Sequence, residues 1–143
     1  MRRRRTSLRH FPRDQRGEAK LDGIVRVSAA ASKIGGSQVY LAEKEQFPLE
    51  ELLKAVMIMS ANDAAFAVAE TLGGNVDDFV SMMNKRAAQL GMSATKFYNP
   101  HGLPKKGANN VSSAIDMAIL ARELLKFPKV LESLMYVPSV MTL

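Results

Sequence analysis

Two apolar helical patterns joined by four small or polar residues, Ser-Ala-Asn-Asp at 60–63, constrain the fold more than any other feature of the sequence. Before this break, apolar residues recur at i, i+3, i+4 and i+7, which predicts a helix over residues 48–59 with Pro48 at its first position. The last turn of this helix is apolar on every side, so we expect it to lie at the centre of a helical cluster. After the break, the pattern predicts a second helix over residues 63–72 that ends at a pair of glycines.

A third helix is predicted to follow these glycines. Asn75 with Asp78 three residues later is typical of a capped helix start, and Gly91 is a typical end. The apolar side chains between them form one stripe, which consists of Phe79, Met83, Ala87 and Leu90. Residues 92–111, which include Asn-Pro-His-Gly-Leu-Pro at 99–104, have the turn residues of a long loop with little regular structure.

A fourth helix and a short fifth one are expected after this loop. Ser112 or Ser113 is a typical N-cap for the fourth helix, and Phe-Pro at 127–128 breaks it. We expect its buried stripe to consist of Met117, Leu120, Ala121 and Leu124. The short helix is predicted from Lys129 to about Met135.

One small β ribbon is predicted before the helices. The β-branched residues of 24–27 indicate a short strand, and Gly-Gly-Ser at 35–37 indicates a turn. Val39, Tyr40 and Leu41 can then pair back against the first strand. The predicted fold class is therefore mainly α with a small β ribbon.

The positive charge of the chain is concentrated at its start. The net charge is +6 at pH 7, and residues 1–20 alone hold eight lysines and arginines against two acidic residues, so the remainder is neutral. A nucleic-acid-binding surface would need a basic stripe with aromatic residues on the folded part, so we expect no nucleic-acid partner. The few apolar residues of 1–20 show no periodicity, which predicts a basic disordered tail followed by one domain over residues 21–143.

Composition limits the chemistry further. The first arginines resemble the start of an export signal, but polar residues follow where an apolar segment of about 7 to 15 residues is required, so no export signal is recognised. No apolar run is long enough for a membrane segment. The chain has no cysteine, which excludes disulfides and thiolate chemistry, and two histidines make no case for a metal site.

Six segments resemble, in order and in register, those of one known family. They are LDGIVRVS (21–28), IGGSQVYL (34–41), LLKAVMIMSANDAAFAVAE (52–70), FVSMMNKRAAQLGM (79–92), FYNPHGLP (97–104) and SSAIDMAILARELLK (112–126). The family is that of the serine-type D-alanyl-D-alanine carboxypeptidases, which are low-molecular-mass penicillin-binding proteins of the peptidase S11 type. The resemblance covers about residues 21–131.

The resemblance implies a fold and a reaction. Such enzymes have the serine beta-lactamase or transpeptidase-like α+β fold, in which a helical subdomain is inserted into a sheet domain, and this chain resembles the helical subdomain. They hydrolyse the terminal D-alanine of peptidoglycan stem peptides through an acyl-serine, and they need no metal or organic cofactor. Three motifs build the site, namely a Ser-x-x-Lys that supplies the nucleophile, a Ser-x-Asn and a carboxylate-binding Lys-Thr-Gly.

Ser60 and Asn62 match the Ser-x-Asn motif. The resemblance implies that the hydroxyl of Ser60 relays a proton and that the amide of Asn62 holds the peptide substrate. A break between two buried helices can direct both groups into one cleft while their backbones stay rigid. From the residues alone, the simpler reading is that Asn62 or Ser60 caps the second helix.

The other two motifs are not found where the family has them. Ser-Leu-Arg-His at 7–10 lacks the lysine, and arginine does not give up its proton near neutral pH. Ser-Ala-Thr-Lys at 93–96 has the right letters but falls in the predicted loop, where no helix would hold Ser and Lys on one face. Lys-Lys-Gly at 105–107 has the wrong middle residue. We therefore expect a truncated fragment that is inactive alone.

Several further expectations follow from the resemblance. His101 has the ordinary pKa of a general base, yet it lies in a rigid turn whose role in the family is mainly structural. The expected partners are peptidoglycan stem peptides and, as inhibitors, beta-lactams, and the family is extracytoplasmic. An alternative function is a non-catalytic remnant that binds peptidoglycan peptides or a partner through the face around Ser60, Asn62 and residues 97–104. A nucleic-acid binder with a basic tail has less support.

Overall fold

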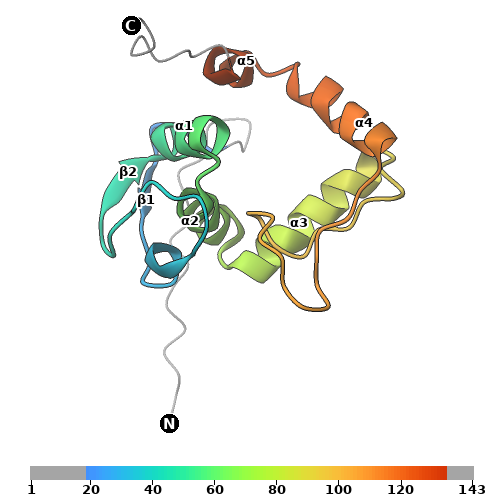
Figure 1. Cartoon of the computed structure of the whole chain (residues 1–143). Coiled ribbons are helices and arrows are strands. Elements are labelled where there is room, and N and C mark those ends of the chain that lie inside the picture. Colours follow the sequence, from blue (N-terminus) through green and yellow to red (C-terminus); the bar gives the residue numbers. More distant parts are fainter. Residues whose placement is uncertain (1–18, 135–143) are drawn as a thin grey trace, which may run out of the picture.

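Helices make up most of the chain. In this computed structural model, which describes residues 19–134, the elements follow in the order β1 (Ile24–Arg26), the 3-10 turn η1 (Ala31–Lys33), β2 (Gln46–Pro48), α1 (Leu49–Met59), α2 (Asn62–Gly73), α3 (Val76–Gln89), α4 (Ala114–Leu124) and α5 (Pro128–Leu134). Figure 1 shows the ribbon and α1 on one side, α3 and α4 on the other, and α5 returning to α1. The predicted fold class, mainly α with a small β ribbon, is confirmed. The predicted basic tail of 1–20 lies outside the described residues up to position 18.

The central helix is α2, not the helix over 48–59 that the sequence favoured. α2 packs against β1, η1, α1 and α3, and most of its residues are buried. Its small residues Ala64 and Ala67 are almost completely inaccessible, so the neighbouring elements approach its backbone closely. By contrast, the apolar last turn of α1 ends at Met59, which is 55% exposed. The prediction was wrong because the described residues cover this turn only in part, with Met57 and Ile58 half-buried and Met59 exposed.

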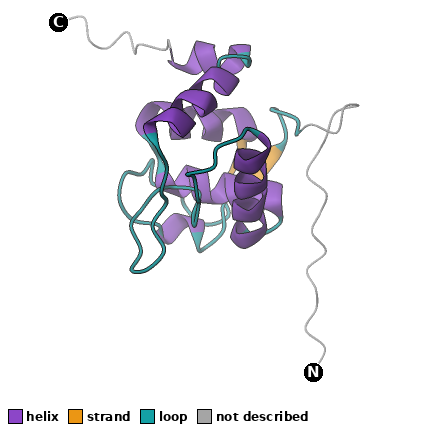
Figure 2. Ribbon diagram, turned by 90° about the vertical axis from the view of Figure 1, so that its right-hand side faces the viewer, coloured by secondary structure: helices purple, strands orange, loops and turns teal. Residues whose placement is uncertain are grey.

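The ribbon also pairs differently from the prediction. β1 is antiparallel to β2, with Val25 opposite Phe47, and the predicted partner at 39–41 has no strand structure. The reason is a competing set of hydrogen bonds, because the side chain of Asp63 accepts the N–H groups of Val39 and Leu41. These donors are therefore unavailable for a sheet ladder. In Figure 2 the ribbon is a small patch at the edge of a helical body.

The third helix and the loop after it agree with the prediction. Asn75 caps α3 by accepting the N–H of Asp78 at 2.8 Å, and Gly91 ends the helix with a φ of 79°. Residues 92–111 are mostly loop, with one isolated bridge between Lys96 and Val111.

The prediction for the fourth helix was right in its boundaries and wrong in its buried face. Ser113 caps α4 by accepting the N–H of Asp116 at 3.1 Å. The expected stripe is largely exposed, however, with Met117 at 40% and Leu124 at 42%. An ion pair between Arg86 and Glu123 at 2.7 Å joins α4 to α3. Leu120 is the half-buried member of the stripe, and it lines a small apolar pocket with residues of α3.

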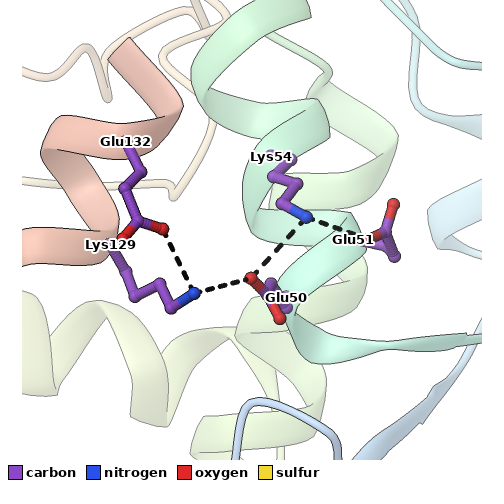
Figure 3. A network of polar contacts seen from close by, with 5 residues as sticks. All are labelled: Glu50, Glu51, Lys54, Lys129 and Glu132. Atoms are coloured by element: carbon purple, nitrogen blue, oxygen red, sulfur yellow. Dashed lines mark hydrogen bonds and ion pairs between the residues drawn. The ribbon is translucent and has the colours of Figure 1, made fainter. Parts of the chain in front are cut away.

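α5 returns to α1 above an apolar groove. Figure 3 shows the ammonium groups of Lys54 and Lys129 converging on the carboxylate of Glu50, each at 3.6 Å, from α1 and α5 respectively. Of these two contacts, the one between Lys129 and Glu50 joins α5 to α1, and exposed ion pairs of this kind contribute little stability. The groove between the helices has a volume of about 730 Å³, and its apolar lining includes Leu21, Val39, Leu53, Met57, Ile58 and Val130. Within residues 19–134 no helix is long and apolar enough to cross a membrane.

Shortening a core side chain of α1 tests this packing. Leu52 is 2% exposed and belongs to the core cluster with Val25 and Leu49. We predict that Leu52→Ala lowers the free energy of unfolding by about 3 kcal/mol, because it removes apolar contacts and leaves a cavity. Ile115→Ala, at a residue that is 74% exposed, should change it by less than about 0.5 kcal/mol. Urea denaturation measures both values, and equal effects of the two substitutions would contradict the assigned core.

Candidate active site around Ser60 and Asn62

Ser60 lies at the junction of α1 and α2 in a left-handed backbone conformation, with φ 53° and ψ 38°. α1 ends here because the N–H groups of Ser60 and Ala61 both donate to the carbonyl of Ala55. A non-glycine residue in a sparsely populated conformation costs about 1–3 kcal/mol and persists where its surroundings impose it. The turn leaves Ser60 exposed, and no described residue forms a hydrogen bond with its hydroxyl. This hydroxyl is therefore free to contact a ligand.

Asn62 is the first residue of α2, but its side chain does not cap the helix. The N-cap is Ala61, and neither Asn62 nor Ser60 supplies a side-chain cap, so that prediction was wrong. Instead, the side-chain amide of Asn62 donates to the carbonyl of Gly35 at 3.0 Å, and its backbone N–H donates to Ser37 at 2.8 Å. Among the described residues none donates to the carboxamide oxygen of Asn62, which remains available as an acceptor.

Asp63 is the residue at this site that sequence reasoning missed. Its side chain is fully buried, and its carboxylate accepts the N–H groups of Val39 at 3.2 Å and Leu41 at 3.0 Å. It also accepts the N–H of Ala64 at 2.9 Å. The sequence did contain a signal, because a lone acidic residue in the first turn of a thoroughly apolar helix must find donors when that helix is buried.

Two loops that are far apart in the sequence meet at Asn62. One is the segment 35–41, and the other is the loop 97–104. Gly36 stands between them, and a Cβ atom there would lie 2.6 Å from the amide nitrogen of Asn62 and 2.9 Å from a methyl group of Leu103. With a φ of 77° as well, this position requires glycine. The structure thus brings the loop 97–104 beside the predicted motif.

His101 is a structural member of the second loop. Its ring stacks on Phe66 of α2 with centroids 6.3 Å apart, and its Nδ1 accepts the N–H of Leu103 at 3.2 Å. Burial lowers the pKa of His101 from its ordinary value of 6.5, which favours the neutral ring. A neutral ring can accept at Nδ1, whereas a protonated ring cannot. His101 therefore helps to shape the loop, in agreement with the structural role expected from its turn.

The two motifs rejected from the sequence lie in turns. Ser93 is exposed in the turn after α3, and Lys96 pairs with Val111 through two backbone hydrogen bonds. The ammonium of Lys96 lies over the ring of Tyr98, 5.9 Å from its centroid, and no hydrogen bond joins it to Ser93. Residues 105–107 form another turn, in which Lys105 accepts the N–H of Ala108. Neither arrangement resembles a nucleophile beside its base or a substrate-binding strand.

The described residues around Ser60 and Asn62 can bind a peptide and relay a proton, but they include no activated nucleophile. Within residues 19–134 no group bonds to the hydroxyl of Ser60 or to the carboxamide oxygen of Asn62, so the hydroxyl can donate or accept a hydrogen bond with a peptide and the oxygen can accept one. No described lysine or histidine hydrogen-bonds to Ser60, so nothing there activates it as a nucleophile. Over residues 19–134 no cluster of His, Asp and Glu is placed to hold a metal ion.

Comparison with known proteins places this geometry in one family. The Peptidase S11 family model, described as D-alanyl-D-alanine carboxypeptidase, matches residues 13–139. The D-alanyl-D-alanine carboxypeptidase DacF of Bacillus subtilis is 44% identical over 115 residues, which are 80% of this chain and 29% of that protein.

Solved structures share the fold of the chain. The D-alanyl-D-alanine carboxypeptidase DacD from Francisella tularensis superposes with a TM-score of 0.76 at 35% identity, over 80% of this chain and 27% of its own. Penicillin-binding protein D2 from Listeria monocytogenes, in its ampicillin-bound form, superposes with a TM-score of 0.68 at 31% identity, over 80% of this chain and 46% of its own. The chain thus spans less than half of the length of these proteins.

The lowered pKa of His101 predicts a pH dependence of stability. Because the pKa of His101 is lower in the folded than in the unfolded chain, the unfolded chain binds more protons below about pH 6.5. We predict that stability is lost as the pH falls from about 6.5 towards the lowered pKa, and that it levels off below it. His101→Phe keeps an aromatic ring against Phe66 but does not titrate, so the variant should lose stability less steeply. Urea denaturation between about pH 7 and pH 5 measures this slope, and identical slopes would contradict the prediction.

Proposed function

This chain belongs to the D-alanyl-D-alanine carboxypeptidase family, and we propose that it supplies the Ser-x-Asn side of an active site for peptidoglycan stem peptides. The observation that carries the proposal is the turn between α1 and α2. It holds the hydroxyl of Ser60 and the carboxamide oxygen of Asn62 at one junction, and neither has a hydrogen-bond partner among the described residues. The backbone of Ser60 has a left-handed conformation that is unfavourable for serine.

Each of the two residues takes one role in the proposal. Ser60 relays a proton, because its exposed hydroxyl can donate and accept at the same time. Asn62 holds an amide of the stem peptide, because its position is set by bonds to Gly35 and Ser37 rather than by a flexible side chain alone. The loop 97–104 forms the adjoining wall, since Leu103 lies next to Asn62 across Gly36.

Hydrolysis by these 143 residues alone is not part of the proposal. The sequence contains one Ser-x-x-Lys, at 93–96, and the structure places it in a turn. Without an activated nucleophile, the chain binds a peptide without cleaving it, since covalent catalysis needs a serine beside its base. A non-catalytic peptide-binding module is the alternative function that this observation favours.

The place of action and the inhibitors follow from the family. Peptidoglycan lies outside the cytoplasmic membrane, so we propose an extracytoplasmic location for the site. Penicillin-binding protein D2, a structural relative, was solved with ampicillin and with cefotaxime bound. For this chain we propose reversible contact with beta-lactams at the turn between α1 and α2, without acylation.

The first test asks whether the chain reacts with a penicillin. We predict no mass increase after incubation with an excess of a labelled penicillin, because neither Ser60 nor Ser93 has a lysine placed to activate it. Intact mass spectrometry measures the adduct. A stoichiometric adduct that Ser93→Ala abolishes would restore residues 93–96 as a catalytic motif, and one that Ser60→Ala abolishes would make Ser60 a nucleophile.

The second test asks whether the turn binds peptide. We predict that an acylated tripeptide ending in D-alanyl-D-alanine binds the chain, and that Ser60→Ala weakens binding about three- to tenfold, the effect of one hydrogen bond. Ser93→Ala is the matched control, since both serines are exposed and lie in turns after helices. Isothermal titration or chemical-shift changes measure the affinity. Equal affinities of the two variants would remove Ser60 from the binding site.

A further inference from the structure

We propose that Asp63 is a positioning residue for the Ser-x-Asn motif, which it acts on through the segment 35–41. This inference rests on the proposed function only where ligand binding is concerned, since the positioning itself is a property of the chain. Asp63 follows Asn62 directly, has no exposed surface, and directs its carboxylate at the backbone of another segment. A buried carboxylate is costly unless donors surround it, so its place here needs a reason.

The chemistry of the contact suits a carboxylate in particular. One oxygen of Asp63 accepts the N–H groups of Val39 and Ala64, at 3.2 and 2.9 Å, and the other accepts the N–H of Leu41 at 3.0 Å. Both oxygens are thus acceptors at once. An asparagine of the same shape would have one oxygen and one NH₂ group, and its NH₂ group would face a backbone donor. Asp63 therefore holds alternate residues of the segment in a way that its closest isostere cannot.

The residue between the two held positions shows that the contact imposes a conformation. Tyr40 has a φ of 58°, in the left-handed region, and it is 84% exposed. That conformation is unfavourable for tyrosine, and no described residue makes a ring contact with Tyr40 that would favour it. The bonds from Val39 and Leu41 to Asp63 flank Tyr40 on both sides and hold its backbone.

The segment 35–41 forms hydrogen bonds with the residues on both sides of Ser60. The carbonyl groups of Gly35 and Ser37 accept the side-chain and backbone N–H groups of Asn62, which follows Ser60. The hydroxyl of Ser37 donates at 2.8 Å to the carbonyl of Met59, which precedes Ser60. A shift of the segment would therefore move both neighbours of Ser60. Asp63 sets where the segment lies, and the segment sets where the motif lies.

Asp116 offers a matched control for the effect of a buried carboxylate. It is 4% exposed, and its carboxylate accepts the N–H of Ala94 at 2.9 Å and the hydroxyl of Thr95 at 2.6 Å. It therefore anchors a loop to the start of a helix, as Asp63 does. The loop that it anchors belongs to the turn at 93–96, which makes none of the contacts that hold Ser60 and Asn62. A purely structural role for both carboxylates would make the two substitutions equivalent at the motif.

The experiment compares Asp63→Asn with Asp116→Asn in the full chain by NMR. We expect Asp63→Asn to speed amide exchange at Val39 and Leu41 about tenfold, as the loss of a buried hydrogen bond does. We also expect it to shift the side-chain NH₂ signals of Asn62, and Asp116→Asn to leave them unchanged. With the acylated tripeptide ending in D-alanyl-D-alanine as the probe, the affinity of Asp63→Asn should fall about tenfold and that of Asp116→Asn should stay the same.

The outcomes separate this inference from the proposed function. If the Asn62 signals move as expected but the unaltered chain does not bind the tripeptide, the positioning role stands and the proposed function fails. If exchange at Val39 and Leu41 speeds up while the Asn62 signals stay fixed, or if Asp116→Asn moves them equally, the positioning role is overturned. If Asp63→Asn does not fold, amide exchange in the unaltered chain provides the test. The positioning role is overturned if the amides of Val39 and Leu41 exchange as fast as that of the exposed Lys106.

Discussion

The burial of α2 is the constraint on which the rest of the structure depends. This helix packs against the ribbon, η1, α1 and α3, and its small residues allow all of them to approach closely. The first turn of α2 is buried as well, so the polar side chains of Asn62 and Asp63 have little access to water and must find hydrogen-bond partners in neighbouring segments. They find them in residues 35–41, and this exchange of hydrogen bonds joins the helices to the loop beside the motif.

This arrangement explains how a short break between helices becomes a site. No described residue bonds to the side chain of Ser60, and yet its backbone is fixed through Met59 before it and Asn62 after it. Binding and catalysis require rigid support around such a polar group, because its geometry is then set during folding and does not have to be ordered when the ligand binds. The loop 97–104 adds a second wall, which His101 shapes by accepting a backbone N–H and stacking on α2.

The apolar surfaces of the chain are unevenly covered. The first half of α1 belongs to the core, whereas its last turn lines the groove below α5, and the stripe on α4 is largely exposed. Such faces agree with the comparison, in which the chain corresponds to less than half of each of these larger proteins. Apolar periodicity identified these helices correctly, but it could not identify which of their faces have neighbours.

The sequence by itself determined the features that depend on residues close in the chain. The caps at Asn75 and Ser113, the helix end at Gly91 and the family resemblance around Ser60 and Asn62 were all readable from local patterns. Only the tertiary structure decided that α2 is central, that β1 pairs with β2, and that Asp63 captures Val39 and Leu41. These outcomes depend on how distant segments compete for backbone hydrogen-bond donors and for buried positions, and no local sequence pattern shows the result of that competition.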